Sequence, residues 1–295
     1  MSIILKTIFI IFIIIVVNYT LYFVIRYLII HVIVFTLLKS PVDYNRRVLL
    51  SDIPPEPQSP HTQATAKIPK ILSQTYHLPH KIPEKVLENK KKFAPDYKVK
   101  IYDDKEGEDF IRQHFTDQVV DRYNKLSGAH KADLLRYCIL YINGGVYADI
   151  KTEFIAPLSS LFKNSYGSKP LIYFVDSIQN TIYNGVIATP EKQKIFLDAI
   201  NFIVQKSILL PELHYGCFIE DLFDKVSADL QTRNFKTGFN EGQNNNYFFY
   251  EEILSRNASD CPDGLDRYGY CSWIYDSDTR PNRQVIKTRY SDYPW

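Results

Sequence analysis

The sequence has few cysteines, a small net charge and no internal repeat, and each of these absences excludes a class of protein. Its 295 residues include only four cysteines, too few for a scaffold held together by disulfides. No Cys-x-x-Cys pair or Cys/His cluster suggests a zinc site. The net charge is only +2, so composition gives no reason to expect a nucleic acid partner. Hydrophobic residues make up 45% of the chain, which is enough for one sizeable core.

The cysteines leave one structural question open. Cys261 and Cys271 are close enough in sequence to form a bridge that closes a loop in an oxidising compartment. Spacing alone does not decide between this bridge and two unpaired thiols. Cys138 lies on the core-facing side of a predicted helix, so we expect it to be a buried free thiol.

Residues 1–40 contain a long apolar run and predict a transmembrane anchor. Residues 7–25 alone would span about 28 Å as a helix, close to the hydrocarbon thickness of a bilayer. No small-x-small cleavage site follows, so an anchor is favoured over a signal peptide. The run exceeds one crossing, so one or two crossings are both compatible with it. A cytoplasmic carboxyl-terminal side is favoured by the basic residues that follow the run, which are Lys39, Arg46 and Arg47.

The remainder divides into a stem and a folded domain. Residues 41–67 are rich in proline and predict an extended stem. In residues 68–295 strands and helices alternate, which predicts an α/β domain with a mostly parallel sheet. The tail beyond Pro211 is weakly periodic, as expected of loops that line a binding face. The predicted strands are 71–75, 97–102, 146–150, 171–175 and 185–188, and the predicted helices are 84–93, 108–114, 117–126, 129–143 and 191–206.

The most informative stretch runs from Ala129 to Thr152. Asp133 and Arg136 are three residues apart on its predicted helix and therefore project side by side. A Gly-Gly pair ends the helix, and the short strand that follows delivers Asp149 at its carboxyl end, where ligands bind in open α/β sheets. Taken singly, these residues are compatible with a surface ion pair and a strand cap. Together, within one helix-turn-strand unit, they predict a site.

This stretch resembles the diagnostic segment of glycosyltransferase family 32, whose members carry a DXD motif and include initiating α-1,6-mannosyltransferases and inositol phosphoceramide mannosyltransferases. The resemblance implies a GT-A-like fold, a GDP- or UDP-hexose donor and retaining transfer to a glycan or glycolipid. It also implies a single-pass type II membrane protein of the Golgi, opposite in orientation to the one that the charges favour. Further segments that resemble the family are 68–76, 95–97, 102–104, 184–190 and 272–273.

By position, the resemblance implies that Asp133, Arg136 and Asp149 are the catalytic residues. Asp149 would be the first aspartate of the DXD motif and a candidate ligand of Mn²⁺ or Mg²⁺. We expect the acceptor among residues of the tail, around His214, Asp221 and residues 244–247. The residues expected to bind the donor are Thr75, Asp133, Arg136, Tyr147, Asp149, Lys151, Asn184, Ser272 and Trp273.

The chain departs from the family pattern at Lys151, which stands where the second aspartate is usual. A charged lysine cannot ligate a divalent metal and repels it. One alternative is that Lys151 itself neutralises the diphosphate and makes the transfer independent of metal. A second is that Asp149 and a carboxyl-terminal group hold the metal. A third is that catalysis is lost, which would leave an inactive nucleotide- or glycan-binding membrane protein of the same fold.

Overall fold

The computed structural model describes residues 67–162, 169–177, 181–206, 216–257, 271–276 and 283–288, and the single residues 259, 261, 265 and 269. All of them belong to the unit Gln58–Trp295. The predicted anchor at 1–40 lies outside the described residues, as does the predicted stem except for its last residue. Among the helices in the described ranges, none is long and apolar enough to cross a membrane.

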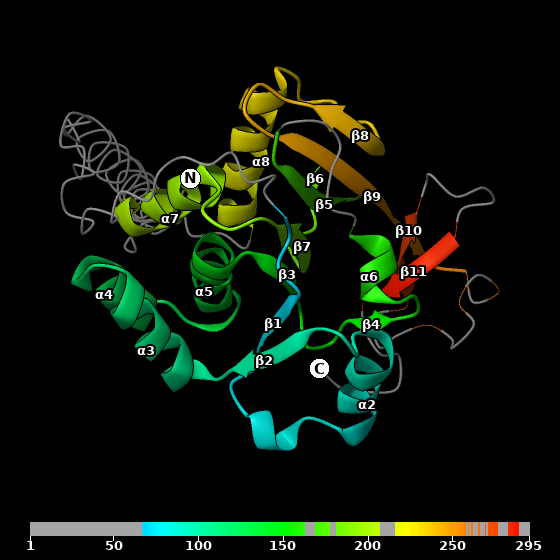
Figure 1. The fold of residues 1–295 in the computed structure, drawn as a ribbon, viewed down its shortest axis with the longest axis horizontal. Helices are drawn as coiled ribbons and strands as arrows, with labels where there is room; N and C mark the ends of the chain where they lie inside the picture. Colours follow the sequence, from blue (N-terminus) through cyan, green and yellow to red (C-terminus); the bar gives the residue numbers. More distant parts are fainter. Residues whose placement is uncertain are drawn as a thin grey trace, which may run out of the picture. The chain divides into compact units, whose positions relative to one another are not determined.

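The described strands form one sheet in the order β2-β1-β3-β7-β5-β9-β10-β11-β4, with β6 added to β5 and β8 to β9 (Figure 1). The strands are β1 (Ile71–Thr75), β2 (Lys98–Tyr102), β3 (Gly145–Ala148), β4 (Glu153–Phe154), β5 (Leu171–Ser177), β6 (Thr181–Ile182), β7 (Val186–Thr189), β8 (Gly238–Glu241), β9 (Asn246–Ser255), β10 (Cys271–Asp276) and β11 (Arg283–Lys287). The helices are η2 (Pro79–Lys81), α2 (Glu84–Phe93), α3 (Asp104–His114), α4 (Asp117–Lys125), α5 (Gly128–Asn143), α6 (Leu158–Leu161), α7 (Lys194–Gln205) and α8 (Cys217–Leu230).

The α/β class is confirmed, but the prediction of a mostly parallel sheet is wrong. β1 runs parallel to β2 and β3, and β5 runs parallel to β9. The other pairings among the described strands are antiparallel. The prediction assumed a helical crossover after each strand. Among the described residues, β5, β6 and β7 instead follow one another with no helix between them, and β7 lies antiparallel to β5.

The prediction that the tail beyond Pro211 consists of loops is also wrong for its described part. Helix α8 alone has 14 residues and strand β9 has 10. β9 pairs with β5 on one side and β10 on the other, and residues 246–250 are all buried. A strand covered on both faces carries a continuous apolar run, so it lacks the alternation that identifies a half-exposed strand.

Two cores lie on opposite faces of the sheet. One contains side chains from α3, α4, α5, α7 and α8, and the other contains side chains from α6. Figure 1 shows these helices on opposite sides of the strands. Successive residues of a strand point to opposite faces, so Tyr147 of β3 belongs to the first core while Val146 and Ala148 belong to the second. This alternation directs Tyr147 toward α5.

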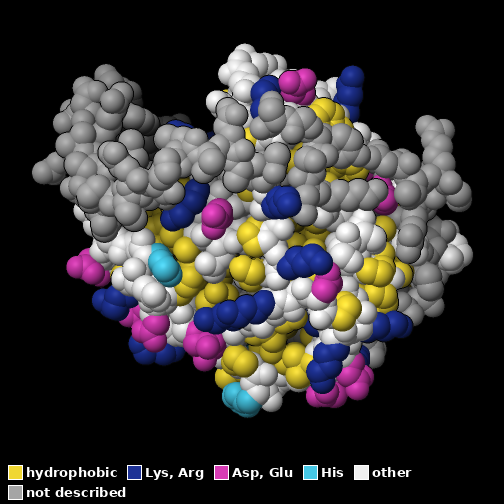
Figure 2. Space-filling model, viewed as in Figure 1, with side chains coloured by type: hydrophobic (Ala, Val, Ile, Leu, Met, Phe, Trp, Pro, Cys, Tyr) yellow, Lys and Arg dark blue, Asp and Glu magenta, His cyan; other side chains and the backbone are white. Residues whose placement is uncertain are grey.

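The surface carries charges of both signs. Figure 2 shows Lys and Arg side chains interspersed with Asp and Glu on the described part of one face. The ion pairs at the surface include Lys70 with Asp96 and Arg112 with Glu108. Such exposed pairs contribute little to stability, so the described core carries most of it.

Candidate active site

A cavity of about 750 Å³ lies at the carboxyl-terminal ends of β1 and β3. Parallel strands such as these present their carboxyl ends at one sheet edge, the usual place for a ligand in α/β proteins. The cavity is lined by the end of β1 and by four other parts of the chain. They are the first half of α5, the turn after β3, the segment from β5 to Asn184, and the start of α8, where the lining residues are Gly216, Ile219 and Glu220.

Two glycines set the geometry of the connection between α5 and β3, the elements that supply most polar side chains of the cavity. Gly144 and Gly145 have φ angles of 57° and 85°, a conformation that other residues rarely adopt. A Cβ atom on Gly145 would lie 2.6 Å from the backbone oxygen of Ile71. Glycine therefore lets β3 begin directly after α5 and lie against β1. The ends of α5 and β3 are thereby fixed relative to each other.

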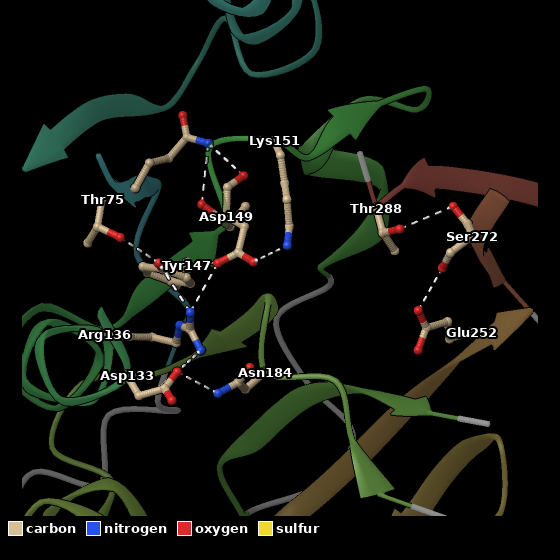
Figure 3. Close-up of polar contacts among 12 residues, drawn as sticks. Thr75, Asp133, Arg136, Tyr147, Asp149, Lys151, Asn184, Glu252, Ser272 and Thr288 are labelled. Carbon is tan, nitrogen blue, oxygen red and sulfur yellow. Dashed lines mark hydrogen bonds and ion pairs between the residues drawn. The ribbon is translucent and has the colours of Figure 1, made fainter. Parts of the chain in front are cut away.

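Arg136 joins the predicted catalytic residues (Figure 3). Its Nη1 donates to Asp133 Oδ1 at 2.7 Å, and its Nη2 donates to Asp149 Oδ1 at 3.0 Å. Asp133 and Arg136 are 7% and 3% exposed, and both line the cavity together with Asp149. The structure thus brings all three residues into one cluster on the cavity wall.

Tyr147 and Thr75 complete the support of Arg136. The guanidinium carbon lies 4.4 Å from the centre of the Tyr147 ring, and the Tyr147 hydroxyl is 2.9 Å from Thr75 Oγ1. Burial raises the pKa of Tyr147 to about 12, so its hydroxyl stays neutral. Burial by itself lowers the pKa of Arg136, but Tyr147, Asp133 and Asp149 hold it well above the ordinary value. Arg136 is a permanent cation in this cluster.

Asn184 contacts the cluster from the segment before β7. Its Nδ2 donates to Asp133 Oδ1 at 2.9 Å. Burial raises the pKa of Asp133, and the contacts with Arg136 and Asn184 oppose that rise. The side chain of Asn184 is buried and lines the cavity. A predicted donor-binding residue from a distant segment is therefore part of the same hydrogen-bonded group.

The turn after β3 carries Asp149 and Lys151, and its backbone is anchored on several sides. Asp149 N donates to Gly185 O at 2.8 Å, and Thr152 N donates to Asp149 O at 2.9 Å, which closes a four-residue turn. Gln74 Nε2 donates to Asp149 O at 3.2 Å. Lys151 lines the cavity, and its Nζ lies 3.5 Å from Asp149 Oδ2.

The residues of this turn do not fit a divalent metal. Asp149 Oδ1 accepts from Arg136 and from the Tyr147 hydroxyl, and Oδ2 faces the Lys151 ammonium. Both carboxylate oxygens thus face donors, whereas a divalent ion requires several free oxygen ligands. Within the described ranges no group of three or more His, Cys, Asp or Glu side chains is arranged to hold a metal.

Ser272 and Trp273 lie outside this arrangement. Among the described residues that line the cavity, neither appears. Ser272 Oγ donates to Glu252 Oε1 at 2.6 Å, and Figure 3 draws this pair with Thr288 as a separate group. Trp273 is buried beside the bonded pair Cys261–Cys271, whose Cα atoms are 5.9 Å apart. The disulfide alternative is therefore the correct one, and Cys138 is buried and free as predicted.

A second cavity of about 440 Å³ adjoins the first and shares Thr75, Tyr76 and His77 with it. No pattern in the sequence predicted this second cavity. Asp103 caps α3 by accepting from Glu106 N at 2.7 Å, which starts this helix earlier than predicted. The other lining residues include Tyr102, Asp103, Asp104, Tyr123 and Lys131.

The residues expected around the acceptor lie elsewhere. His214 is outside the described residues. Asp221 pairs with Lys225, and Asp229 accepts from Asn244, Asn245 and Tyr247. None of the described members of this set lines either of the two cavities. The cavity lining also includes residues that no local sequence signal identified, among them Ser177, Thr181 and Glu220.

Comparison with known proteins identifies the region that holds the cluster. Residues 83–169 match the family described as the glycosyltransferase sugar-binding region containing a DXD motif. The chain is 30% identical over 156 residues to mannosyl phosphorylinositol ceramide synthase SUR1 of Saccharomyces cerevisiae, covering 50% of this chain and 36% of that protein. It is 31% identical over 93 residues to inositol phosphoceramide mannosyltransferase 3 of Schizosaccharomyces pombe, covering 30% and 26%.

The matched part of the chain therefore spans only 36% and 26% of the length of these two curated relatives. Among solved structures it is similar to the PaToxG glycosyltransferase, with 17% identity and a TM-score of 0.42 over 56% of this chain and 73% of that one. The resemblance to glycosyltransferase family 32 is confirmed: residues 83–169 are similar to the sugar-binding region of the DXD-containing glycosyltransferases, and both curated relatives are mannosyl-transferring enzymes by name.

Proposed function

We propose that the chain is a membrane-anchored retaining glycosyltransferase that moves a hexose, with mannose as the first candidate, from a nucleotide sugar to a glycan or glycolipid. The observation that supports this best is the cluster of Asp133, Arg136 and Asp149 in the wall of the larger cavity. Carboxylates accept hydrogen bonds from sugar hydroxyls. The N–H groups of a planar guanidinium donate hydrogen bonds to the oxygens of sugar hydroxyls.

The sugar and the ribose of the donor are assigned to this cluster. Asp133 and Arg136 contact the sugar, with Asn184 holding Asp133 in place. Asp149 accepts from ribose hydroxyls. Tyr147 and Thr75 act indirectly, because they support the guanidinium rather than the ligand.

The diphosphate is assigned to Lys151. When the sugar leaves, negative charge develops on the diphosphate, and a nearby cation stabilises it. The Lys151 ammonium is 3.5 Å from the nearest Asp149 oxygen, too long for a strong hydrogen bond, so it can turn to a phosphate at little cost. Since the Asp149 carboxylate is already engaged by Arg136, we propose that the transfer does not require Mn²⁺ or Mg²⁺.

The nucleoside is assigned to the smaller cavity. Tyr76, which is partly exposed, offers aromatic surface to a base, and Asp103 and Asp104 offer carboxylates to the amino groups of the base. The two cavities adjoin at the residues that they share, so we place one ligand with a sugar and a nucleoside across both.

The acceptor is assigned to the wall formed by Ser177, Thr181, Ile219 and Glu220. The names of both curated relatives mention inositol phosphoceramide or its mannosylated form, which supports a mannosyl donor and a glycolipid acceptor. The apolar run in residues 1–40 supports a membrane anchor, and the Cys261–Cys271 disulfide supports an oxidising secretory compartment such as the Golgi.

In the proposed step the bond from the anomeric carbon to the β-phosphate oxygen breaks and a bond to the acceptor oxygen forms. The acceptor hydroxyl gives its proton to the departing β-phosphate oxygen, and the nucleoside diphosphate leaves. Arg136 and Lys151 supply the positive charge, and the cavity holds the acceptor hydroxyl near the anomeric carbon.

The test uses the full chain in detergent with GDP-mannose and a panel of other GDP- and UDP-hexoses. We expect release of the nucleoside diphosphate and a hexose mass added to an inositol-containing acceptor. Binding of a nucleotide sugar by calorimetry without turnover on any acceptor or water would instead support an inactive binding protein. Absence of both binding and turnover would contradict the proposal.

A further inference from the structure

Helix α2 places a buried ammonium group beneath the turn that carries Asp149 and Lys151. The side chain of Lys90 belongs to a residue that is only 3% exposed. Its Nζ donates to Thr152 O at 2.7 Å, and Thr152 is the residue that closes the turn. The contact joins two segments that are 62 residues apart in sequence.

Other residues of α2 contact the same segment, residues 150–154. Val86 and Lys90 are the residues of this helix that are buried, and Val86 packs in one cluster with Ile150 of the turn. Asn89 donates through Nδ2 to Phe154 O at 2.9 Å and accepts through Oδ1 from Phe154 N at 3.0 Å. One face of α2 therefore holds the chain at positions 150, 152 and 154.

Burying the Lys90 ammonium against the Thr152 carbonyl costs desolvation free energy. Burial lowers the pKa of Lys90 to about 7, and the carboxylate of Glu153 only partly opposes this effect. Glu153 is itself 3.5 Å from the buried Lys287. An apolar side chain of similar length could pack α2 against β4 without this cost. The presence of a charged group points to a use other than packing.

We propose that Lys90 is a positioning residue of the candidate active site, holding the turn at residues 149–152 so that Asp149 and Lys151 face the cavity. The Lys90 ammonium binds the carbonyl of Thr152 at the end of the turn, whereas Gln74 and Gly185 bind the backbone of Asp149 at its start. Its significance for transfer depends on the proposed function, whereas its hold on the turn does not.

The test compares Lys90→Met with Lys92→Met, which removes an exposed lysine from the same helix and leaves Thr152 untouched. Hydrogen exchange of the peptide covering residues 149–156 reports on the turn without any ligand. We expect exchange about tenfold faster in Lys90→Met and unchanged in Lys92→Met, because the loosened turn opens more often. In the transfer assay we expect kcat to fall about 10- to 100-fold for Lys90→Met, while the melting temperature does not decrease.

The outcomes separate the two proposals. If the wild-type chain shows neither turnover nor donor binding, the proposed function fails, and the exchange data still decide whether Lys90 holds the turn. Unchanged exchange in Lys90→Met overturns the positioning role, and so does a wild-type kcat in that variant. Should Lys90→Met not fold, Lys90→Gln keeps a donor without the charge, and the same two criteria apply to it.

Discussion

Arg136 Nη2 lies 3.0 Å from Asp149 Oδ1 and thereby ties helix α5 to the turn after strand β3. The same guanidinium holds Asp133, and the other oxygen of Asp149 faces Lys151. The two carboxylates and two cations of this group balance in formal charge. A diphosphate that binds beside this neutral cluster therefore meets the Lys151 ammonium, whose 3.5 Å contact with Asp149 is the longest ion pair of the group.

Replacing Arg136 should destabilise the fold. Arg136→Met leaves Asp133 buried without its cation, a change that costs about 3–5 kcal/mol of unfolding free energy. Arg112→Met is the matched control, because Arg112 is half exposed and forms an i,i+4 pair with Glu108. It should cost less than about 1 kcal/mol. Urea denaturation measures the free energy of unfolding of both variants. Equal losses would mean that the buried Arg136–Asp133 pair stabilises the fold no more than the exposed pair.

Removing the Asp149 carboxylate should weaken donor binding. Asp149→Ala takes away the acceptor assigned to ribose and leaves Arg136 without one of its two carboxylates. We expect the dissociation constant for the nucleotide sugar, measured by calorimetry, to rise at least about tenfold. Asp121→Ala, at an exposed position on α4, serves as the control and should bind like the wild type. Retained affinity in Asp149→Ala would remove this residue from the site.

Turnover should persist in the presence of EDTA, because Lys151 rather than a metal is assigned to the diphosphate. Lys151→Met should then lower kcat about 100-fold with little change in KM, since the lost charge acts mainly as the diphosphate leaves. Lys151→Asp supplies the usual second aspartate and should be active only with added Mn²⁺. Loss of wild-type activity in EDTA, with recovery on adding Mn²⁺, would show that a metal is required after all.

Lys90 should make stability depend on pH in a predictable direction. Its pKa is about 7 in the folded chain against an ordinary value of 10.5. Between these values the unfolded chain binds more protons at this site than the folded chain, so the free energy of unfolding rises with pH across this window. The rise amounts to a few kcal/mol, at about 1.4 kcal/mol per pKa unit.

Lys90→Met lacks this titration, so the difference in unfolding free energy between the variant and the wild type should be largest below pH 7 and shrink toward pH 10.5. Guanidinium denaturation at several pH values measures it. A difference that stays constant with pH would mean that Lys90 keeps an ordinary pKa in the folded chain.

Reduction of the Cys261–Cys271 disulfide should destabilise the domain. The bond closes a loop with a sequence separation of 10, for which loss of loop-closure entropy predicts about 2–3 kcal/mol. A thermal melt with and without reductant measures the effect. The double variant Cys261→Ala/Cys271→Ala is the control, because it should melt at the same temperature in both conditions. A reductant effect that persists in the double variant would have another cause.

The parts of the site that depend on neighbours along the chain were predictable from sequence. Helical periodicity placed Asp133 beside Arg136, and the two side chains are 2.7 Å apart. Two glycines ended α5 and allowed β3 to follow at once, so Asp149 stands at the end of a strand. Propensity, spacing and backbone freedom are local properties, and these predictions needed nothing else.

The other parts depend on which strands become neighbours, and only the tertiary structure decided that. Sheet order brings Asn184 onto Asp133 and turns Ser272 toward Glu252 instead of into the cavity. It also made the sheet mixed, because hairpin connections replaced the expected crossovers. Lys90 has the same local pattern as the lysines beside it, and only the packing of α2 against the turn makes its ammonium a buried one. Contacts between distant segments leave no periodic trace in the sequence, because they depend on how whole elements pack.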